Sequence, residues 1–330
     1  MRHYSYLKEL LEDFTRGDFD SIDISDRDRL IYQPIKDGMT REMLSPESTY
    51  KLYKLTRFPI IGKMLMNHRI NQYINWVDGV FTKEYCQKIR TDMTEELRLH
   101  GNELNEAFEL LDEESKRLFL DLICLRLTGN FRYALSSHWM KEQYLSEKIT
   151  WKEKPNIVDA GGYIGDTLLS FLRNGIIPGE YYIYELEENN YNQLLKNVKK
   201  ASKKGVKVYI RKKGVYSKNG KLYFIADRDS SKIVDYQTDN SIDVVTIDSD
   251  VKARPDFIKM DIEGSEVEAL KGAADLIRQY SPTLAICIYH KKDDFWKIPL
   301  LIQCINPNYK RFWIEHYQIS YNETVLYVSM

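Results

Sequence analysis

The amino-acid sequence predicts an α/β protein built on a doubly wound sheet, preceded by a mainly helical N-terminal region. After Lys154, short β-branched or aromatic runs alternate with helical stretches, which is typical of a parallel sheet with helices on both faces. Before Thr150, apolar residues recur instead at spacings of three and four, which favours helices. The 330 residues therefore divide into a helical region over 1–150 and a sheet domain over 151–330.

The helical region is predicted from four segments that each carry apolar residues on one face. Asp112 is a suitable N-cap, because acids follow it at Glu113 and Glu114. The stretch Tyr50–Trp76 is rich in Tyr, Met, Ile and Leu but less periodic, so it is a candidate dimer interface. The four predicted helices are Lys8–Phe14, Lys83–His100, Glu103–Asp112 and Glu113–Leu127.

In the sheet domain, short strand-like runs are separated by helical stretches. The predicted strands are Asn156–Ala160, Tyr181–Glu185, Val206–Arg211, Leu222–Ile225, Val244–Ile247, Phe257–Asp261, Leu284–Tyr289, Phe312–Tyr317 and Thr324–Val328. The predicted helices are Asp166–Asn174, Asn189–Ala201, Glu263–Ser281 and Pro299–Ile305. Ligands of such sheets bind at the carboxyl ends of the strands, so the residues at those ends are the candidates for a site.

The composition excludes several classes of protein. Hydrophobic residues make up 43% and charged residues 29%, which is ordinary for a globular chain and excludes disorder and fibres. The 48 basic and 49 acidic residues give a net charge of −1, so no overall field attracts nucleic acid or anionic lipid. No apolar run is long enough to span a bilayer, and acids interrupt the start where a signal peptide needs an apolar core.

The four cysteines are far apart and form neither a metal-binding nor a disulfide pattern. We therefore expect reduced thiols in a cytoplasmic protein. These cysteines are Cys86, Cys124, Cys287 and Cys304.

The segment VDAGGYIGDT follows the first predicted strand and opens a helix. Gly161 and Gly162 allow a tight turn and leave room for a ligand, and Gly165 allows close packing at the helix start. Asp166 and Thr167 suit the first turn of that helix, where the dipole favours an acid and a hydroxyl can cap. The alternative is a glycine turn with a purely structural role.

Asp159 stands where a dinucleotide-binding fingerprint has its first glycine. An anionic side chain there repels a pyrophosphate and attracts a cation, which favours S-adenosylmethionine over NAD as the ligand. Glu185, at the tip of the second strand, is placed to accept hydrogen bonds from two ribose hydroxyls. The alternative for Glu185 is a solvent-exposed acid in a run that includes Glu187 and Glu188.

The segment FIKMDIEGSEVEALKGA places Asp261, Glu263 and Glu266 at a junction between a strand and a helix. Three acids at one junction are costly to crowd together unless they face a cation, hydrogen-bond donors or water. The alternative for Glu266 is a cap favoured by the helix dipole. The next strand ends in Tyr289 and His290, and a histidine there can accept a proton near neutral pH. A structural histidine is the alternative.

Together these segments resemble the FkbM-type family of S-adenosylmethionine-dependent O-methyltransferases. The motifs that carry the resemblance are VDAGGYIGDT, IYELEENNYNQLLKNV, FIKMDIEGSEVEALKGA and ICIYHKKDDFWKIP. The resemblance implies a Rossmann-like, seven-stranded methyltransferase sheet and S-adenosylmethionine as the cofactor. Leu186 and Glu315 depart from it, since the family commonly has proline and arginine there. The cofactor-binding residues that it implies are Asp159, Ala160, Gly161, Gly162, Tyr163, Gly165, Asp166, Thr167, Glu185, Leu186, Gly214, Val215 and Asp261.

The predicted reaction is methyl transfer from S-adenosylmethionine to a hydroxyl of a small molecule or sugar, as in polysaccharide or natural-product biosynthesis. His290 is the predicted base, with Asp261 orienting or replacing it and Glu263 beside them. The sequence contains no clear set of metal ligands, so we expect no metal.

The acceptor itself is not identified by these motifs. Tyr289, Trp296 and Tyr317 are candidate walls of its pocket, with core positions as the alternative. The helical region over 1–150 is expected to contact the acceptor or a second copy of the chain.

Three other functions remain open. The first is a catalytically silent binding module that keeps the fold. The second is an RNA methyltransferase, since Lys196–Gly214 holds nine lysines and arginines and no acid. Such runs are usually solvated helix faces, and this one lacks interleaved base-stacking aromatics. The third is a nicotinamide oxidoreductase, which Asp159 disfavours.

Overall fold

The computed structural model describes residues 83–128, 134, 141–202, 204–227, 230–234, 236–238, 240–318 and 321–330. The chain divides into two compact units. The first comprises Met1–Glu109, Glu113–Ser137 and Gln318–Tyr321, and the second comprises Leu110–Asp112, His138–Tyr317 and Asn322–Met330. The predicted helix Lys8–Phe14 and the candidate dimer interface Tyr50–Trp76 lie outside the described residues.

The described part of the first unit is helical, as its apolar spacing predicts. Helix α5 (Lys83–Leu110) contains a kink at His100, where φ is −130° and ψ is 27°. This kink separates the two helices that the sequence predicts in that segment. Helix α6 (Glu113–Thr128) begins with two acids in its first turn, and the rings of Phe108 and Phe119 join the two helices with centroids 5.8 Å apart.

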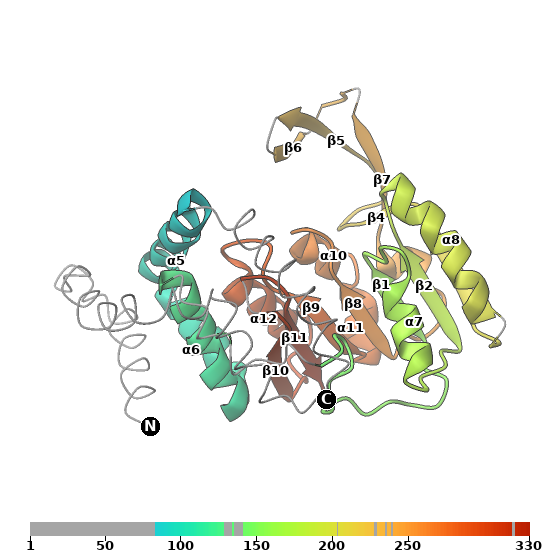
Figure 1. Cartoon of the computed structure of the whole chain (residues 1–330), viewed down its shortest axis with the longest axis horizontal. Helices are drawn as coiled ribbons and strands as arrows, with labels where there is room; N and C mark the ends of the chain where they lie inside the picture. Colours follow the sequence, from blue (N-terminus) through green and yellow to red (C-terminus); the bar gives the residue numbers. More distant parts are fainter. Residues whose placement is uncertain are drawn as a thin grey trace, which may run out of the picture. The chain divides into compact units, whose positions relative to one another are not determined.

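The second unit is built on a mixed seven-stranded sheet with the order β10-β11-β9-β8-β1-β2-β3 (Figure 1). Neighbouring strands are parallel except that β11 runs antiparallel to both β9 and β10. The sheet and its flanking helices confirm the predicted fold class. The strands are β1 (Ile157–Ala160), β2 (Glu180–Tyr184), β3 (Lys207–Arg211), β8 (Phe257–Met260), β9 (Thr283–Cys287), β10 (Arg311–His316) and β11 (Thr324–Ser329).

The strand order reverses direction at β1. From β1 the chain builds outward through β2 and β3 on one side, and later through β8 and β9 on the other. β1 and β8 are adjacent strands, and the loops that follow them run in opposite directions. This leaves a crevice at the carboxyl ends of these two strands. This switch point positions the candidate site.

Helices α7 (Asp166–Arg173) and α8 (Glu188–Ser202) share a buried core with one face of the sheet. Apolar residues of α7 and α8 pack there with alternate residues of the strands, such as Tyr181 and Ile183 of β2. Trp151, Phe171 and Phe257 form an aromatic cluster in this layer, with ring centroids 5.0–5.9 Å apart. The remaining helices contact one another: α9 (Ile247–Asp250), α10 (Glu266–Lys271), α11 (Ala274–Tyr280) and α12 (Asp294–Ile305).

Two predicted helices differ from the structure. The predicted helix Glu263–Ser281 is divided into α10 and α11, and it starts late because Glu263 (φ 55°) and Gly264 (φ 91°) are left-handed. The break falls near Gly272, where a Cβ would lie 2.0 Å from the Tyr216 carbonyl oxygen. The helix predicted to begin at Pro299 begins at Asp294 and contains Pro299 in its interior.

Two predicted strands belong to a second sheet rather than to the main one. This sheet has the order β4-β7-β5-β6, and its strands lie between β3 and β8 in the sequence (Figure 1). The segment predicted as Leu222–Ile225 lies within β5, and Val244–Ile247 ends one strand and begins α9, whose N-cap is Thr246. The strands are β4 (Gly214–Val215), β5 (Gly220–Asp227), β6 (Ser230–Val234) and β7 (Ser241–Val245).

Candidate active site

A cavity of 520 Å³ lies at the switch point of the main sheet. Its size falls within the range of cofactor and small-molecule sites. Its lining residues come from the loop before β1, the turn after β1, the ends of β2 and β8, the second sheet, and the loops after β9 and before β11. The predicted site residues among them are Gly161, Tyr163, Asp166, Thr167, Glu185, Leu186, Gly214, Val215, Asp261 and Glu263.

The glycine turn after β1 forms the wall of this cavity next to the sheet. The backbone N–H groups of Gly161 and Gly162 donate to the Tyr184 carbonyl oxygen at 3.1 and 2.8 Å. Gly161 is left-handed (φ 82°), and a Cβ on it would lie 1.8 Å from the Asp261 carbonyl oxygen. The turn therefore lies directly against the ends of both neighbouring strands. Gly162 and Gly165 shape the turn but do not line the cavity.

Glu185 joins the end of β2 to the glycine turn. One carboxylate oxygen accepts the Tyr163 N–H at 2.8 Å, and the other accepts the Glu187 N–H at 2.7 Å. These bonds hold the carboxylate at the rim of the cavity, where the sequence predicts a ribose contact.

Asp159 is not at the mouth of the sheet, contrary to the sequence-based expectation. Its side chain is fully buried, lies 3.0 Å from Lys259 Nζ and accepts the Tyr181 hydroxyl at 2.7 Å. Burial alone would lower the pKa of Lys259, but the Asp159 and Asp261 carboxylates raise it. Lys259 neutralises Asp159, so this carboxylate attracts no ligand cation directly. Neither Asp159 nor Ala160 lines the cavity.

Lys259 is a site residue that sequence reasoning missed. It lies in the buried strand β8, donates to the Gly161 carbonyl oxygen and lines the cavity. The signal was present, because a lysine inside an otherwise apolar strand requires a buried partner.

Asp261 lies at the carboxyl end of β8 and faces the cavity. One of its oxygens accepts the Tyr144 hydroxyl at 2.9 Å, and the other accepts the Tyr289 hydroxyl at 3.3 Å. Two tyrosines from distant parts of the second unit thus fix the orientation of this carboxylate. Glu263 follows on the left-handed turn, and its side chain is 91% exposed.

His290 is buried behind Asp261 and does not line the cavity. Its Nε2 lies 3.4 Å from Asp261 Oδ1, and its Nδ1 lies 3.0 Å from Glu266 Oε1. Burial lowers the pKa of His290, but contact with Glu266 and the charges of Asp261 and Glu263 outweigh burial and raise it. Because Asp261 lines the cavity and His290 does not, Asp261 is the one of the two that a bound ligand would meet.

The far side of the cavity is lined by residues that no sequence motif indicated. Glu323 accepts the Gln143 amide N–H at 2.8 Å and shares the Tyr289 hydroxyl, at 3.5 Å, with Asp261; burial raises the pKa of Glu323. Gln143 and Tyr144 are neighbours in one loop and Glu323 lies in another, about 180 positions later, so no local pattern could have joined them. Of the predicted acceptor walls, Tyr289 lines the cavity, whereas Trp296 and Tyr317 do not.

The ionisable lining of the cavity is predominantly acidic. It contains six carboxylates and two lysines, one of which is Lys259, already paired with Asp159. The cavity therefore favours neutral or positively charged ligands over anions. The lining acids are Asp166, Glu185, Glu187, Asp261, Glu263 and Glu323.

No helix in the described part of the chain is both long enough and apolar enough to cross a membrane. Among the described residues, no disulfide joins Cys124, Cys287 or Cys304; the first two are buried and the third is exposed.

Comparison with solved structures shows a likeness to methyltransferase FkbM from Methylobacillus flagellatus KT. The two chains are 24% identical, with a TM-score of 0.60 over 71% of this chain and 60% of that one. This likeness shows a shared fold, and this chain spans only 60% of the length of that protein.

Two further structures are more distant. A putative rRNA methylase from Clostridium thermocellum is 12% identical, with a TM-score of 0.35 over 54% of this chain and 87% of that one. Aeropyrum pernix fibrillarin, with natively bound S-adenosyl-L-methionine, is 12% identical, with a TM-score of 0.35 over 56% of this chain and 70% of that one. Neither likeness is close enough to carry an argument about this chain.

A search of curated protein sequences gave no significant match. The family model described as the methyltransferase FkbM domain, in contrast, matches residues 159–318. This match begins at the end of β1 and includes the glycine turn, Asp261 and β10. It confirms the resemblance that the sequence motifs indicated. The chain therefore carries a methyltransferase FkbM domain over residues 159–318.

Proposed function

We propose that this chain transfers a methyl group from S-adenosylmethionine to a hydroxyl of a small molecule or sugar, in the cytoplasm. One observation carries the proposal: an acidic cavity between the glycine turn and Asp261, at the switch point of a methyltransferase domain. Because S-adenosylmethionine carries a sulfonium and an ammonium group, an acidic lining suits it electrostatically.

The residues around the cavity fit this cofactor. Glu185 presents a carboxylate held in place by two backbone N–H groups, and its remaining acceptor sites suit a pair of ribose hydroxyls. Gly161 and Tyr163 of the turn would lie against the bound cofactor, and Asp166 would face its positive charge. When bound, S-adenosylmethionine would supply an electrophilic methyl group on sulfur.

Asp261 is the residue proposed to accept the proton of the acceptor hydroxyl. It faces the cavity, and the hydroxyls of Tyr144 and Tyr289 hold both of its oxygens in place. Removal of a proton by a positioned side chain contributes roughly 10²–10⁴-fold in rate. His290, which reaches the cavity only through Asp261, is proposed to orient that carboxylate.

Alignment of the acceptor supplies the other part of the proposed catalysis. Holding two reactants in line can contribute about 7–11 kcal/mol to lowering the barrier. The side of the cavity lined by Gln143, Tyr289 and Glu323 offers amide, hydroxyl and carboxylate groups. Such groups match a hydroxylated, uncharged acceptor better than a phosphorylated one.

The test begins with cofactor binding. Calorimetry is expected to show S-adenosylmethionine binding to the full chain, and Glu185→Gln is expected to weaken it about 10–100-fold, because a charged hydrogen bond contributes roughly 1.5–3 kcal/mol. Glu188→Gln is the matched control, since Glu188 is exposed, pairs with Lys212 and does not line the cavity. Absence of binding, or equal effects of the two variants, would contradict the proposed cofactor site.

The second part of the test addresses the reaction. A screen of oligosaccharides and other uncharged hydroxylated metabolites, with nucleotide sugars as the phosphorylated comparison, is read by mass spectrometry and is expected to reveal a product heavier by one methylene. Asp261→Asn should lower the turnover of that acceptor while leaving the protein folded. Cofactor binding without transfer to any acceptor would instead favour the silent binding module.

A further inference from the structure

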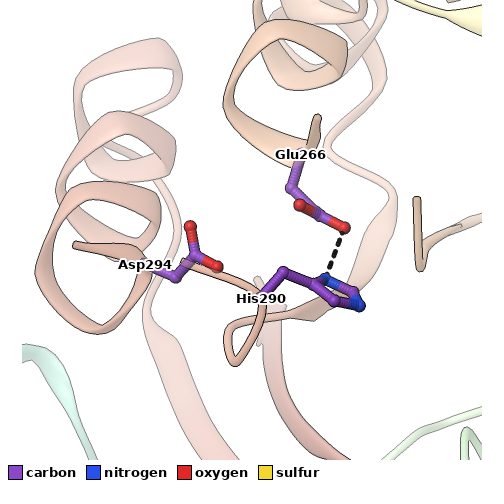
Figure 2. Close-up of side chains that lie close together, drawn as sticks. All are labelled: Glu266, His290 and Asp294. Atoms are coloured by element: carbon purple, nitrogen blue, oxygen red, sulfur yellow. Dashed lines mark ion pairs between the residues drawn. The ribbon is translucent and has the colours of Figure 1, made fainter. Parts of the chain in front are cut away.

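Glu266, His290 and Asp294 form a buried side-chain cluster beside the cavity, without lining it (Figure 2). Glu266 begins α10, His290 lies in the loop after β9 and Asp294 begins α12. Each contributes one potential metal-ligand atom, and these atoms lie within 4.8 Å of one another. Three separate segments of the second unit thus bring two carboxylates and an imidazole to one point.

An unsatisfied buried oxygen provides independent evidence that this cluster accepts a ligand. Glu266 is 0% exposed, and its Oε2 has no hydrogen-bond partner among the described residues. Its Oε1 is occupied, since it accepts the Ile262 N–H at 2.9 Å and lies 3.0 Å from His290 Nδ1. A buried carboxylate oxygen without a partner is costly, and a cation would remove that cost.

The imidazole adds to this argument. Among the described residues, neither ring nitrogen of His290 makes a well-aligned hydrogen bond, although Nδ1 lies next to Glu266. Figure 2 shows the Glu266 carboxylate above the His290 ring, joined to it by the dashed line, and the Asp294 carboxylate to the left of both. Asp294 keeps its place because its Oδ2 accepts the Lys291 N–H at 2.7 Å.

We infer that Glu266, His290 and Asp294 bind one divalent transition-metal ion. The donor set indicates the kind of ion, because carboxylate oxygens with an imidazole nitrogen suit Zn²⁺ or Mn²⁺, whereas Mg²⁺ and Ca²⁺ prefer oxygen alone. Ligands at about 2.1 Å from one ion lie at most about 4.2 Å apart, so side-chain shifts of roughly half an ångström complete the site.

The bound ion would act on positioning. It would join the starts of α10 and α12 to the loop after β9, which carries Tyr289 and His290. With Nδ1 on the ion, the hydrogen of His290 resides on Nε2, the nitrogen that lies 3.4 Å from Asp261. The site does not depend on which acceptor is methylated, and binding of the ion is measurable without any turnover.

The experiment uses the full chain after treatment with a chelator and dialysis. Mn²⁺ binding is followed by electron paramagnetic resonance and Zn²⁺ binding by calorimetry, with Mg²⁺ for comparison. We expect one ion per chain, a higher melting temperature in its presence, and weaker binding of Mg²⁺.

Asp294→Asn is the informative variant, since the amide oxygen can still accept the Lys291 N–H while a charged ligand is lost. We expect this variant to weaken the binding of Mn²⁺ and Zn²⁺ by at least about tenfold and to abolish the rise in melting temperature that the ion causes. Glu266→Gln should do the same. Asp293→Asn is the matched control, because Asp293 is adjacent, carries the same charge and pairs with Lys297 at the surface.

Three results would overturn the inference. Wild-type chain that binds neither Mn²⁺ nor Zn²⁺ would leave the cluster as a histidine–carboxylate ion pair. Binding that survives Asp294→Asn, with circular dichroism showing a folded variant, would put the ion elsewhere. Equal loss in Asp293→Asn and Asp294→Asn would show an effect of charge alone.

Discussion

At the scale of single residues, the buried pair of Asp159 and Lys259 is the feature that most changes the interpretation of the sequence. Lys259 Nζ lies 3.0 Å from Asp159 Oδ1, and both side chains are almost fully buried. Such a pair is costly to break, because removal of one partner leaves an uncompensated charge away from water. The ammonium also donates to the Gly161 carbonyl oxygen, so the pair supports the turn that lines the cavity.

We predict that Lys259→Met destabilises the protein by roughly 3–5 kcal/mol, since it strands the Asp159 charge in the core. Adding Asp159→Asn should recover part of this loss, because the charge is removed while the oxygen can still accept the Tyr181 hydroxyl. Urea unfolding measures both variants. Lys252→Met, at an exposed lysine, is the control and should cost less than about 0.5 kcal/mol. If Lys259→Met lowered the free energy of unfolding no more than Lys252→Met does, the buried ion pair would be contradicted.

At the scale of elements, the turn between β1 and α7 holds the site together. Its N–H groups bond to the end of β2, while Gly161 lies against the end of β8. The left-handed conformation at Gly161 costs a non-glycine residue roughly 1–2 kcal/mol by itself. The contact with the Asp261 carbonyl oxygen adds a second reason for glycine that local sequence rules do not contain.

This distinction can be measured with two glycines of similar conformation. Gly161 (φ 82°) has strand backbone in the way of a Cβ, whereas Gly175 (φ 79°) has nothing within 4 Å. We expect Gly175→Ala to cost about 1–2 kcal/mol, from conformation alone. Gly161→Ala should cost clearly more and also weaken S-adenosylmethionine binding, as followed by thermal unfolding and calorimetry. Equal losses in the two variants would show that close approach to Asp261 is unimportant.

At the scale of the whole molecule, the charge is nearly balanced but its distribution is not. The net charge is −1, yet the cavity carries six carboxylates against two lysines. The cationic run of Lys196–Gly214 lies largely elsewhere, on α8, β3 and the loops beside them, and only Lys213 and Gly214 of this run line the cavity. An electrostatic preference of the cavity therefore could not be inferred from total charge.

This asymmetry predicts a salt dependence that follows ligand charge. S-adenosylmethionine has one more positive charge than S-adenosylhomocysteine, and one charge near a hydrated carboxylate is worth about 1 kcal/mol. Raising the ionic strength from about 0.01 to about 1 M shortens the Debye length from about 30 to 3 Å. The affinity for S-adenosylmethionine should therefore fall roughly fivefold more than the affinity for S-adenosylhomocysteine. Calorimetric titrations measure both. Glu187→Gln, at a lining acid, should reduce the difference, and Glu188→Gln should not; equal salt dependence of both ligands would contradict the electrostatic argument.

The sequence by itself determined the features that depend on a few neighbouring residues. The alternation of strands and helices, the glycine turn, and the acids Glu185 and Asp261 at strand ends follow from periodicity and turn chemistry, which act locally. The single helix predicted over Glu263–Ser281 is wrong at two places. Its first residues are left-handed, and near Gly272 the backbone of another segment approaches too closely for the helix to continue.

Only the tertiary structure decided which side chains meet. In the structure, Asp159 and His290 do not line the cavity, and Asp159 pairs with Lys259 instead. Tyr144 donates a hydrogen bond to Asp261, which lies 117 positions later in the chain. The tertiary structure also assigned β5 and β7 to a separate sheet. These outcomes depend on which strands pair and which buried charges meet. Such contacts join segments that are far apart in the sequence, so no pattern among neighbouring residues predicts them.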